Sequence, residues 1–389
     1  MQTWKWLYHP GVPFTWRFVR NVILKAAILF AALNAVFALL NPLPALGHLS
    51  AYNWLLQGRE RLPYGENPGV AYNLSLYQLD AMFASHKLAG ADHKGEYRVL
   101  LIGDSSVWGI LLRPEDTLAG QINAGNYHTA DGRRVRAYNL GYPTMSLIKD
   151  LMLLDYARRY KPDLIVWLFT LESFDRDAQL DSAIVQNNAD RVQRLIQTFG
   201  LKLDTNDPHF VRLSFQQKTL IGRRRDLADL LRLQYYGVPW TLTGIDQEYR
   251  TDYTPRAIDL PADATWHGLT QETFTPDDLA FEVLDAGFQM VGKTPLLLIN
   301  EPMFISDGQN SDIRYNAFFP RWAYDDYRRL LAEQAARFNW PLLDLWDILP
   351  GAACYTDSAV HLTPDCSAQL GKRVGAAIVQ MADTGAISP

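Results

Sequence analysis

The sequence predicts an α/β protein built on a doubly wound, five-stranded parallel sheet of the flavodoxin-like type. Short apolar runs alternate with amphipathic segments of helical period over residues 98–169, and this pattern resumes over residues 277–381. Uninterrupted apolar runs are typical of strands buried on both faces. A strand–helix–strand order favours parallel pairing with helices on both faces of the sheet.

The elements follow from these patterns. The expected strands cover residues 99–102, 135–140, 164–169, 295–299 and 342–346. The expected helices cover residues 117–124, 146–160, 277–291, 320–338 and 364–381, with Ser146 and Thr363 as N-caps and Pro364 at the first helical position. Residues 175–275 break the rhythm, so we expect a helical insertion there, with helices over 181–199 and 218–236 and then a long loop.

The N-terminal region is expected to anchor the chain in a membrane. Residues 1–20 contain Lys5, Arg17 and Arg20 and no acidic residue, interleaved with aromatic residues, and residues 22–40 are almost wholly apolar. A helix over that apolar stretch spans roughly 28 Å, close to the thickness of a bilayer core. A cleaved signal peptide is the alternative, but its apolar core would be shorter.

This anchor sets the expected domain organisation. Residues 1–47 form the cytoplasmic N-terminus and the transmembrane helix, residues 48–95 form a linker and lead-in, and residues 96–383 form the α/β domain. Positive charges before the span predict a cytoplasmic N-terminus. The chain is therefore expected to be a single-pass protein of the cell membrane, with its main domain outside the cytoplasm.

Composition excludes some classes of function. The formal net charge of -5 argues against nucleic-acid binding, which requires a concentrated basic surface. The two cysteines and eight histidines do not show the spacing of a zinc site, so no metal or other cofactor is expected.

A polar tetrapeptide, Gly103-Asp104-Ser105-Ser106, follows the first expected strand. Side chains just past a strand lie at the carboxyl edge of the sheet, where open α/β folds place their sites. A hydroxyl there can act as a nucleophile when a base reaches it, and Ser105 is the candidate. Asp and Ser are also preferred helix N-caps, so this stretch alone leaves both interpretations open.

A histidine and a carboxylate stand in the loop before the last expected helix. His361 lies three residues before Pro364, and Asp357 lies four residues before His361. The predicted topology brings this loop to the same sheet edge as Ser105. A hydroxyl, an imidazole that takes its proton and a carboxylate that orients the imidazole are the parts of an acyl-transfer site. A loop histidine bonded to backbone is the commoner alternative for His361 taken alone.

Three blocks together resemble the SGNH/GDSL hydrolase family. Residues 103–106 resemble its first block, with the nucleophile at Ser105, and residues 357–364 resemble its last block. The sequence Asn139-Leu140-Gly141-Tyr142-Pro143 resembles its second block, whose glycine supplies an oxyanion-hole amide. The resemblance covers about residues 95–175 and 290–383. It implies the SGNH version of the fold and a Ser105–His361–Asp357 site, with the N–H groups of Ser105 and Gly141 as oxyanion donors.

Two positions depart from the family pattern. Glu172 stands where the family's third block has an oxyanion-binding Asn, and a carboxylate cannot donate unless it is protonated. Losing one oxyanion donor costs roughly 3–4 kcal/mol of transition-state stabilisation. The family's acid usually lies three residues before the histidine, where this chain has Ser358. Asp357 is one residue further away, so either side chain could orient the ring.

These departures, together with the N-terminal span, resemble membrane-anchored SGNH-like proteins of alginate O-acetylation and of D-alanyl transfer to teichoic acid. That resemblance implies an acyltransferase or esterase of the cell envelope that acts on a cell-surface polysaccharide or another acyl acceptor. It also implies a membrane-bound O-acyltransferase, or another membrane complex, as partner. A catalytically inactive SGNH-like subunit of a membrane complex is the alternative. A secreted lipase is a weaker one, because nothing indicates a lipid-sized apolar cleft.

Two further sets of residues concern the site. Cys354 and Cys366 bracket the loop that carries His361, and outside the cytoplasm a disulfide between them would contribute about 3 kcal/mol in the chain-entropy model. Two unpaired thiols are the alternative. Polar residues near the ends of expected strands are candidate substrate contacts, although each could instead be structural: Glu172, Asn300, Glu301 and Arg314.

Overall fold

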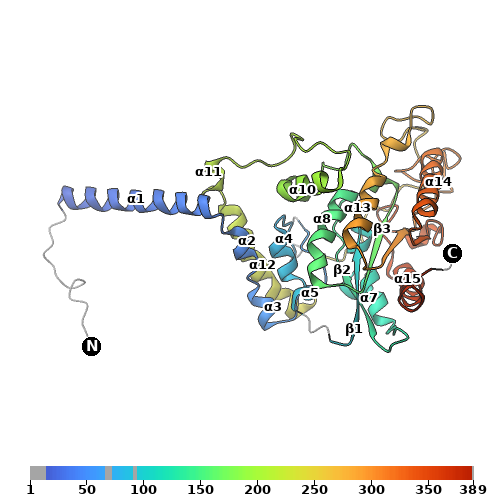
Figure 1. The fold of residues 1–389 in the computed structure, drawn as a ribbon, viewed down its shortest axis with the longest axis horizontal. Coiled ribbons are helices and arrows are strands. Elements are labelled where there is room, and N and C mark those ends of the chain that lie inside the picture. Colours follow the sequence, from blue (N-terminus) through green and yellow to red (C-terminus); the bar gives the residue numbers. More distant parts are fainter. Residues whose placement is uncertain (1–14, 66–71, 91–93, 388–389) are drawn as a thin grey trace.

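The computed structural model describes residues 15–65, 72–90 and 94–387, and a five-stranded sheet lies at its centre (Figure 1). The strand order is β2-β1-β3-β4-β5, and all neighbouring strands are parallel. The strands are β1 (Glu96–Ile102), β2 (Arg134–Asn139), β3 (Leu164–Phe169), β4 (Leu296–Asn300) and β5 (Leu342–Asp344). The predicted five-stranded, doubly wound α/β fold is thereby confirmed.

Helices cover both faces of this sheet. One face packs against α4 (Leu79–Ser85), α8 (Leu147–Ala157), α10 (Ala189–Phe199), α13 (Phe281–Val291) and α14 (Arg321–Phe338). The other face packs against α7 (Leu118–Ala124) and α15 (Pro364–Thr384). Residues of β1 alternate between the two cores, with Leu100 in the first and Leu101 in the second. This alternation explains why the strand is apolar throughout.

Parallel pairing gathers the segments that follow the strands at one edge of the sheet. The short helix α6 (Ser105–Trp108) follows β1, and the 3-10 helix η4 (Leu171–Phe174) follows β3. Glu301 directly follows β4. The other 3-10 helices are η2 (Pro114–Asp116), η3 (Arg158–Tyr160), η5 (Pro276–Asp278) and η6 (Ala352–Cys354).

The segment predicted as a linker and lead-in packs into the domain wherever the structure describes it. It contributes α3 (Ala51–Leu55), α4 and α5 (Lys87–Gly90). Arg61 is fully buried, pairs with Asp246 and donates to the carbonyl oxygen of Gly109 at 2.8 Å. The lead-in therefore supports the turn that follows α6. The packing of this segment could not be predicted from its sequence, because charged residues normally lie on a solvated surface.

The insertion differs from its prediction in where the helices begin and end. The helix expected over residues 181–199 is divided into α9 (Ala183–Gln186) and α10, because the Asn188 amide donates to the carbonyl oxygens of Ile184 and Tyr77 and competes with the helix. The helix expected over residues 218–236 is instead α11 (Phe215–Lys218) followed by α12 (Arg224–Thr243). The second helix continues through Pro239.

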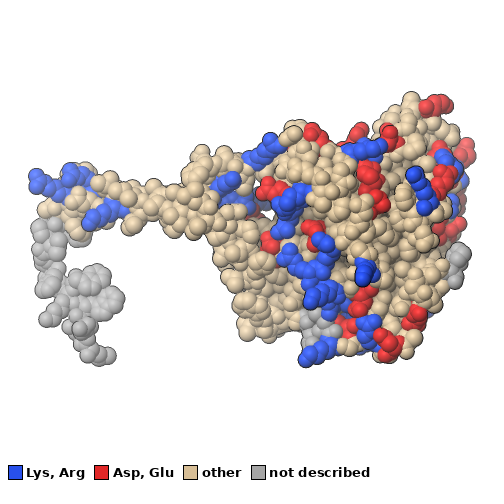
Figure 2. All heavy atoms as spheres, viewed as in Figure 1, with Lys and Arg blue, Asp and Glu red and all other residues tan. Residues whose placement is uncertain are grey.

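The N-terminal helix α1 (Trp16–Leu40) extends away from the domain and meets it only at its carboxyl end, where α2 (Leu43–Gly47) begins (Figure 1). Among the described residues, it is the one helix that is long and apolar enough to cross a membrane. Figure 2 shows basic side chains at the outer end of α1, and the rest of the helix up to the domain carries no charged side chains in this view. The part of the predicted basic segment before residue 15 lies outside the described residues.

Candidate functional site

The Gly103–Ser106 turn places Ser105 at the carboxyl edge of the sheet. Asp104 is the N-cap of α6, and its Oδ1 accepts the N–H of Ser106 at 2.7 Å. A Cβ on Gly103 would lie 2.9 Å from the Leu168 carbonyl oxygen, so the tight passage from β1 to α6 requires glycine. The capping interpretation therefore applies to Asp104, and the Ser105 side chain is free of that role.

His361 connects Ser105 to Asp357. Its Nε2 lies 2.8 Å from the Ser105 Oγ, and its Nδ1 lies 2.8 Å from the Asp357 Oδ1. This geometry requires that Nδ1–H donates to the carboxylate and that Nε2 accepts the serine hydroxyl proton. Asp357 thus reaches the ring despite its extra residue of separation, and Ser358 is not needed to orient it.

The electrostatics favour the same arrangement. Partial burial of Asp357 is the largest single influence and favours its neutral form, but the hydrogen bond and charge of His361, together with a backbone N–H and the Thr356 hydroxyl, lower the pKa of the carboxyl on balance. Asp357 therefore stays ionised at neutral pH. A fixed carboxylate holds the imidazole in the tautomer that accepts a proton at Nε2.

The loop that carries His361 is closed at its base. Cys354 and Cys366 form a disulfide across 12 residues of sequence. Inside the loop, the Thr356 N–H donates to the His361 carbonyl oxygen at 2.9 Å. The Arg256 side chain, from the insertion, donates to the Tyr355 carbonyl oxygen at 3.0 Å. The loop is therefore held by one covalent and several polar contacts.

The two predicted oxyanion donors differ in availability. Ser105 is the first residue of α6, so its N–H lacks an acceptor within that helix. The Gly141 N–H instead donates to the Asn139 Oδ1 at 3.0 Å. The Gly141 N–H is therefore engaged in this structure, and its role as an oxyanion donor stays a prediction. The neighbouring Asn139 was missed as a site residue, although an asparagine that ends a buried strand is a signal of such a side-chain contact.

Glu172 lies in η4 and pairs with a residue of the insertion. His267 Nε2 lies 3.0 Å from Glu172 Oε1 and 3.7 Å from Asp175 Oδ2. The hydrogen bond that His267 donates to the Glu172 carboxylate is the largest of the influences that raise the pKa of His267. Glu172 thus joins the long loop to the sheet edge, a partner that local sequence patterns do not reveal.

Asn300 and Arg314 have buried, structural positions. The Asn300 Oδ1 accepts the hydroxyl of Tyr327 at 3.1 Å, and its Nδ2 donates to Asp344 at 2.8 Å. Arg314 donates to backbone carbonyl oxygens of both the insertion and its own loop, at Asp263, Thr265, Asn316 and Ala317. Both side chains are buried and bond to other protein groups, so the structure gives each a structural role. Their predicted contacts with a substrate stay predictions.

Glu301 lies beneath the nucleophile turn and does not face solvent. Its Oε2 accepts the Ser106 hydroxyl. Glu301 Oε1 and Asp104 Oδ2 accept from no other described donor, and the two carboxyl groups can share a hydrogen bond when one is protonated. Burial, and then the neighbouring Asp104 carboxylate, raise the pKa of Glu301 well above its ordinary value. Its surroundings therefore favour the neutral form of Glu301, which lies beside Asp104 with less repulsion than a second carboxylate would.

A buried Lys149–Asp150 pair in α8 also supports the site and was missed. Lys149 Nζ donates to the carbonyl oxygen of Gly103 at 2.8 Å and to that of Tyr142 at 3.1 Å. Asp150 pairs with Lys149 and accepts the indole N–H of Trp167 at 3.1 Å. The lysine thus joins the nucleophile turn to the Gly141 loop. Adjacent opposite charges within an otherwise apolar helix are the signal that could have identified this pair.

Among the described residues, no cluster of three or more His, Cys, Asp or Glu side chains could hold a metal ion. What the site can supply is a hydroxyl with its proton acceptor, an oriented imidazole and a backbone donor at the start of α6.

Comparison with known proteins gives distant structural similarities only. No family model and no curated protein sequence matches the chain. Similar solved structures include a carbohydrate acetylesterase family member from Sinorhizobium meliloti, with 12% identity, a TM-score of 0.32, and coverage of 73% of this chain and 98% of that one. A lipase/acylhydrolase from Enterococcus faecalis has 14% identity, a TM-score of 0.33, and coverage of 75% and 98%.

A third similar structure is assigned to the lipolytic G-D-S-L family and comes from Desulfitobacterium hafniense. It has 10% identity and a TM-score of 0.34, and the match covers 72% of this chain and 99% of that one. All three are esterases or lipolytic proteins by description. At these scores the similarities carry no conclusion about activity, which depends on the geometry of the site.

Proposed function

We propose that this protein is a serine-dependent acyl-transfer enzyme of SGNH type, an esterase or an acyltransferase. The observation that supports this is the hydrogen-bonded chain from Ser105 through His361 to Asp357, with both bonds at 2.8 Å. Such a chain raises the nucleophilicity of a hydroxyl by giving its proton an acceptor.

The proposed reaction has two halves. Ser105 Oγ attacks the carbonyl carbon of an acyl ester while His361 Nε2 takes the hydroxyl proton. His361 then returns this proton to the departing alcohol oxygen, which leaves the acyl group on Ser105. In the second half His361 Nε2 removes a proton from water or from an acceptor hydroxyl, and that oxygen attacks the acyl carbon. The bond between the acyl carbon and Ser105 Oγ then breaks, and His361 returns the proton to Ser105 Oγ. Water completes an esterase cycle, whereas an acceptor hydroxyl completes an acyl transfer.

Stabilisation of the oxyanion depends on two backbone donors in this proposal. The Ser105 N–H is positioned by the start of α6. The Gly141 N–H can contribute only when its bond to Asn139 Oδ1 opens. Each donor is worth roughly 3–4 kcal/mol of transition-state stabilisation, so catalysis should be slow until both are available.

We further propose that the enzyme is anchored by α1 in the cell membrane, with its N-terminus in the cytoplasm and its domain outside. The apolar composition of α1 and the basic side chains at its start support this orientation. The acceptor would then be a cell-surface polysaccharide or another extracytoplasmic hydroxyl. A membrane-bound O-acyltransferase would be a suitable acyl-supplying partner.

One observation favours a second candidate function, an inactive structural subunit of a membrane complex. The Gly141 N–H is already engaged, and Glu172 offers no donor in place of the expected amide. A site with one oxyanion donor would retain the triad geometry without a useful rate.

Labelling with a serine-reactive fluorophosphonate distinguishes the two candidates. The full-length protein should be labelled stoichiometrically, Ser105→Ala should abolish labelling, and Ser106→Ala should retain it. Circular dichroism of each variant shows that the fold is intact. Absence of labelling in a folded wild-type protein would favour the structural subunit, and labelling that persists in Ser105→Ala would assign another nucleophile.

A further inference from the structure

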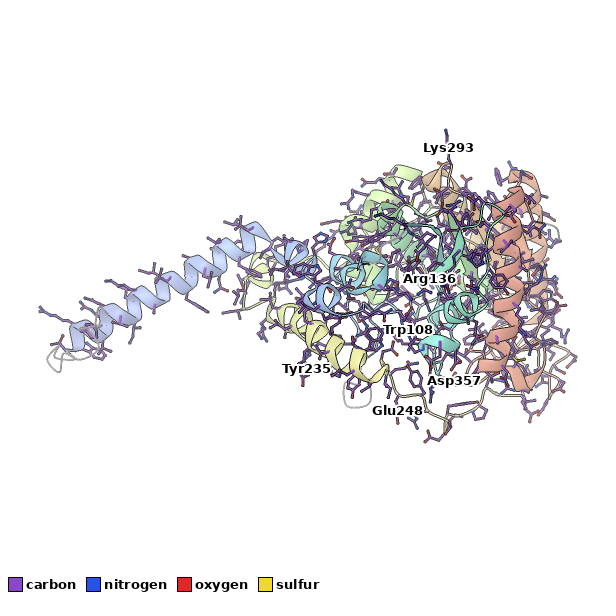
Figure 3. The ribbon with its side chains drawn as sticks, turned by 90° about the horizontal axis from the view of Figure 1, so that it is seen from below. Trp108, Arg136, Tyr235, Glu248, Lys293 and Asp357 are labelled. Carbon is purple, nitrogen blue, oxygen red and sulfur yellow. A yellow bond between two sulfur atoms is a disulfide. The ribbon has the colours of Figure 1, made fainter. Side chains whose placement is uncertain are left out.

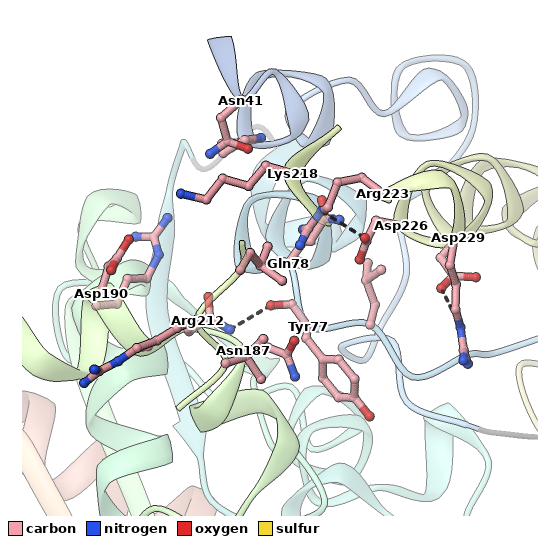
Figure 4. Close-up of a pocket in the computed structure, with 18 of the residues that line it drawn as sticks. Asn41, Tyr77, Gln78, Asn187, Asp190, Arg212, Lys218, Arg223, Asp226 and Asp229 are labelled. Atoms are coloured by element: carbon pink, nitrogen blue, oxygen red, sulfur yellow. Dashed lines mark hydrogen bonds and ion pairs between the residues drawn. The ribbon is translucent and has the colours of Figure 1, made fainter. Parts of the chain in front are cut away.

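A cavity of about 1090 Å³ lies where α1 meets the domain, away from Ser105 (Figure 4). The end of α1, the segment before α4, the start of α10 and the α11–α12 region form its walls. Figure 4 shows Lys218 and Arg223 on one side of the hollow, with Asp190 and Arg212 on the other. None of the triad residues lines this cavity.

The lining of the cavity is strongly basic. Three aspartates and six cationic side chains line it, and the cations are Arg191, Arg194, Arg212, Lys218, Arg223 and Arg225. Arg223 pairs with Asp226 at 3.0 Å, and Arg225 lies 3.9 Å from Asp229. Arg191 pairs with Asp80, outside the lining, at 3.2 Å. Among the described residues, the other three lining cations, Arg194, Arg212 and Lys218, show no ion pair with a carboxylate. Their charge favours an anionic ligand.

Neutral polar groups beside these cations also lack partners. Both amide atoms of Gln78 and the hydroxyl oxygen of Ser75 are buried without a hydrogen-bond partner among the described residues, and both residues line the cavity. Buried polar atoms without partners are rare and costly. A ligand that combines an anionic group with hydroxyl groups would satisfy the cations and these atoms together.

The cavity lies at the level where α1 leaves the domain. Ala38, Leu39 and Asn41 contribute to its wall, and Leu40 is 73% exposed beside it. One turn before Ala38 in α1, the Asn34 Oδ1 accepts the N–H of Ile221 at 3.2 Å. This bond holds the segment between α11 and α12 against α1. In a membrane-spanning α1, these contacts place the cavity among lipid headgroups.

The surface beside the cavity is unusually apolar. Leu231, Tyr235, Val238 and Leu242 recur at helical spacing along α12 and are 44–81% exposed. Figure 3 shows Tyr235 on the outer side of this helix. On neighbouring α3, Trp54 is 70% and Leu55 is 83% exposed. An exposed apolar stripe with aromatic residues and adjacent arginines is typical of a helix that lies at a membrane interface.

We propose that the basic cavity binds the headgroup of an anionic phospholipid, with its phosphate near Lys218 and Arg212 and its glycerol hydroxyls near Gln78 and Ser75. The exposed stripe of α12 and α3 would rest on the same leaflet. The domain would then be held close to the bilayer in one orientation, and not only tethered. This inference rests on the membrane anchoring proposed above, but it is independent of the acyl-transfer chemistry.

The test uses the full-length protein in neutral detergent, so that it does not depend on membrane insertion. Short-chain phosphatidylglycerol, short-chain phosphatidylcholine and inorganic phosphate are each titrated while the melting temperature is measured. Native mass spectrometry counts the lipids retained. We expect phosphatidylglycerol to raise the melting temperature, with one molecule retained per chain, whereas phosphatidylcholine and inorganic phosphate should have little effect.

Charge-removing variants identify the site. Lys218→Gln with Arg212→Gln should weaken phosphatidylglycerol binding by about tenfold or more. Lys293→Gln provides the control, because Lys293 is exposed between α13 and β4, outside the cavity. Unchanged melting temperatures of the unliganded variants show that they fold.

Three outcomes would overturn the proposal. Equal stabilisation by phosphatidylcholine would show that charge is not recognised. Equal stabilisation by inorganic phosphate would assign a site for free anions. Undiminished binding of phosphatidylglycerol by the double variant would place the lipid elsewhere. Each outcome leaves the Ser105 labelling experiment unaffected, so the two proposals can fail separately.

Discussion

At the scale of single residues, the site depends on protons held in particular places. The hydrogen bonds and charge around Asp357 together outweigh its partial burial and favour its ionised form, whereas burial and Asp104 favour the neutral form of Glu301. These two carboxyl groups therefore act in opposite ways. Asp357 orients the imidazole, and Glu301 fills the space under the Asp104–Ser106 turn without adding a charge.

Glu301 should make the protein less stable as the pH rises. Its folded-state pKa lies above its unfolded value, so the folded state binds more protons once the pH exceeds about 4.5, and stability falls by up to about 1.4 kcal/mol per pH unit until the folded-state pKa is reached. Glu301→Gln removes this proton linkage. The stability of the variant relative to wild type should therefore be greater at pH 8 than at pH 5.

Urea unfolding at these two pH values measures the difference. Glu333→Gln on the exposed side of α14 is the matched control and should show no such pH-dependent gain. A Glu301→Gln variant whose relative stability is the same at both pH values would show that Glu301 is ionised in the folded protein.

At the scale of elements, the site depends on how two short loops are held. The Lys149 ammonium ties the Gly103 turn to the Gly141 loop from below, and the disulfide closes the segment that carries His361. Arg256 and Arg61 bring polar contacts from the insertion and the lead-in. Contacts from segments that are far apart in the sequence thus fix the relative positions of Ser105, His361 and Asp357.

Removal of the disulfide should weaken both stability and labelling. Closure of a loop with a sequence separation of 12 residues contributes about 3 kcal/mol in the chain-entropy model, and it restricts the position of His361. We expect the Cys354→Ser, Cys366→Ser double variant to have a lower melting temperature and a slower rate of fluorophosphonate labelling. Reduction of the wild-type protein with dithiothreitol should reproduce both changes. An unchanged labelling rate would show that the polar contacts alone hold the loop.

At the scale of the whole molecule, α1 projects from one side of the domain, and α12 and α3, which carry exposed apolar side chains, lie on that side (Figure 1). The described residues of the sheet and its two cores lie beyond them. This separation supports a model in which one end of the molecule contacts lipid and the carboxyl edge of the sheet stays accessible to solvent.

The proposed orientation can be tested with an engineered thiol. Both native cysteines are paired, so Lys293→Cys adds a single reactive thiol on an exposed turn. We expect a membrane-impermeant maleimide to label this variant in intact cells, or in spheroplasts where an outer barrier is present, and to leave the wild-type protein unlabelled. Labelling that requires disruption of the membrane next to α1 would place the domain in the cytoplasm.

Membrane association is tested separately by extraction. The full-length protein should stay in the membrane pellet in alkaline carbonate and enter solution in detergent, because α1 exposes most of its apolar residues. Release by carbonate alone would exclude a transmembrane α1. The thiol and extraction experiments together separate the presence of the anchor from its direction.

The sequence by itself determined the parallel sheet, the apolar N-terminal span and the choice of Ser105 and His361 as candidate site residues. The sheet and the span follow from local patterns, and the two site residues follow strands whose carboxyl ends share one edge of a parallel sheet. Local patterns could not show that Gly141 donates to Asn139, that Arg61 is buried against Asp246, or that α12 begins at Arg224. Only the tertiary structure decided these features. Buried polar groups find their partners on segments that are distant in the sequence, and such segments also form the walls of the cavity at the carboxyl end of α1. Whether these groups are buried is not encoded in any short stretch of sequence.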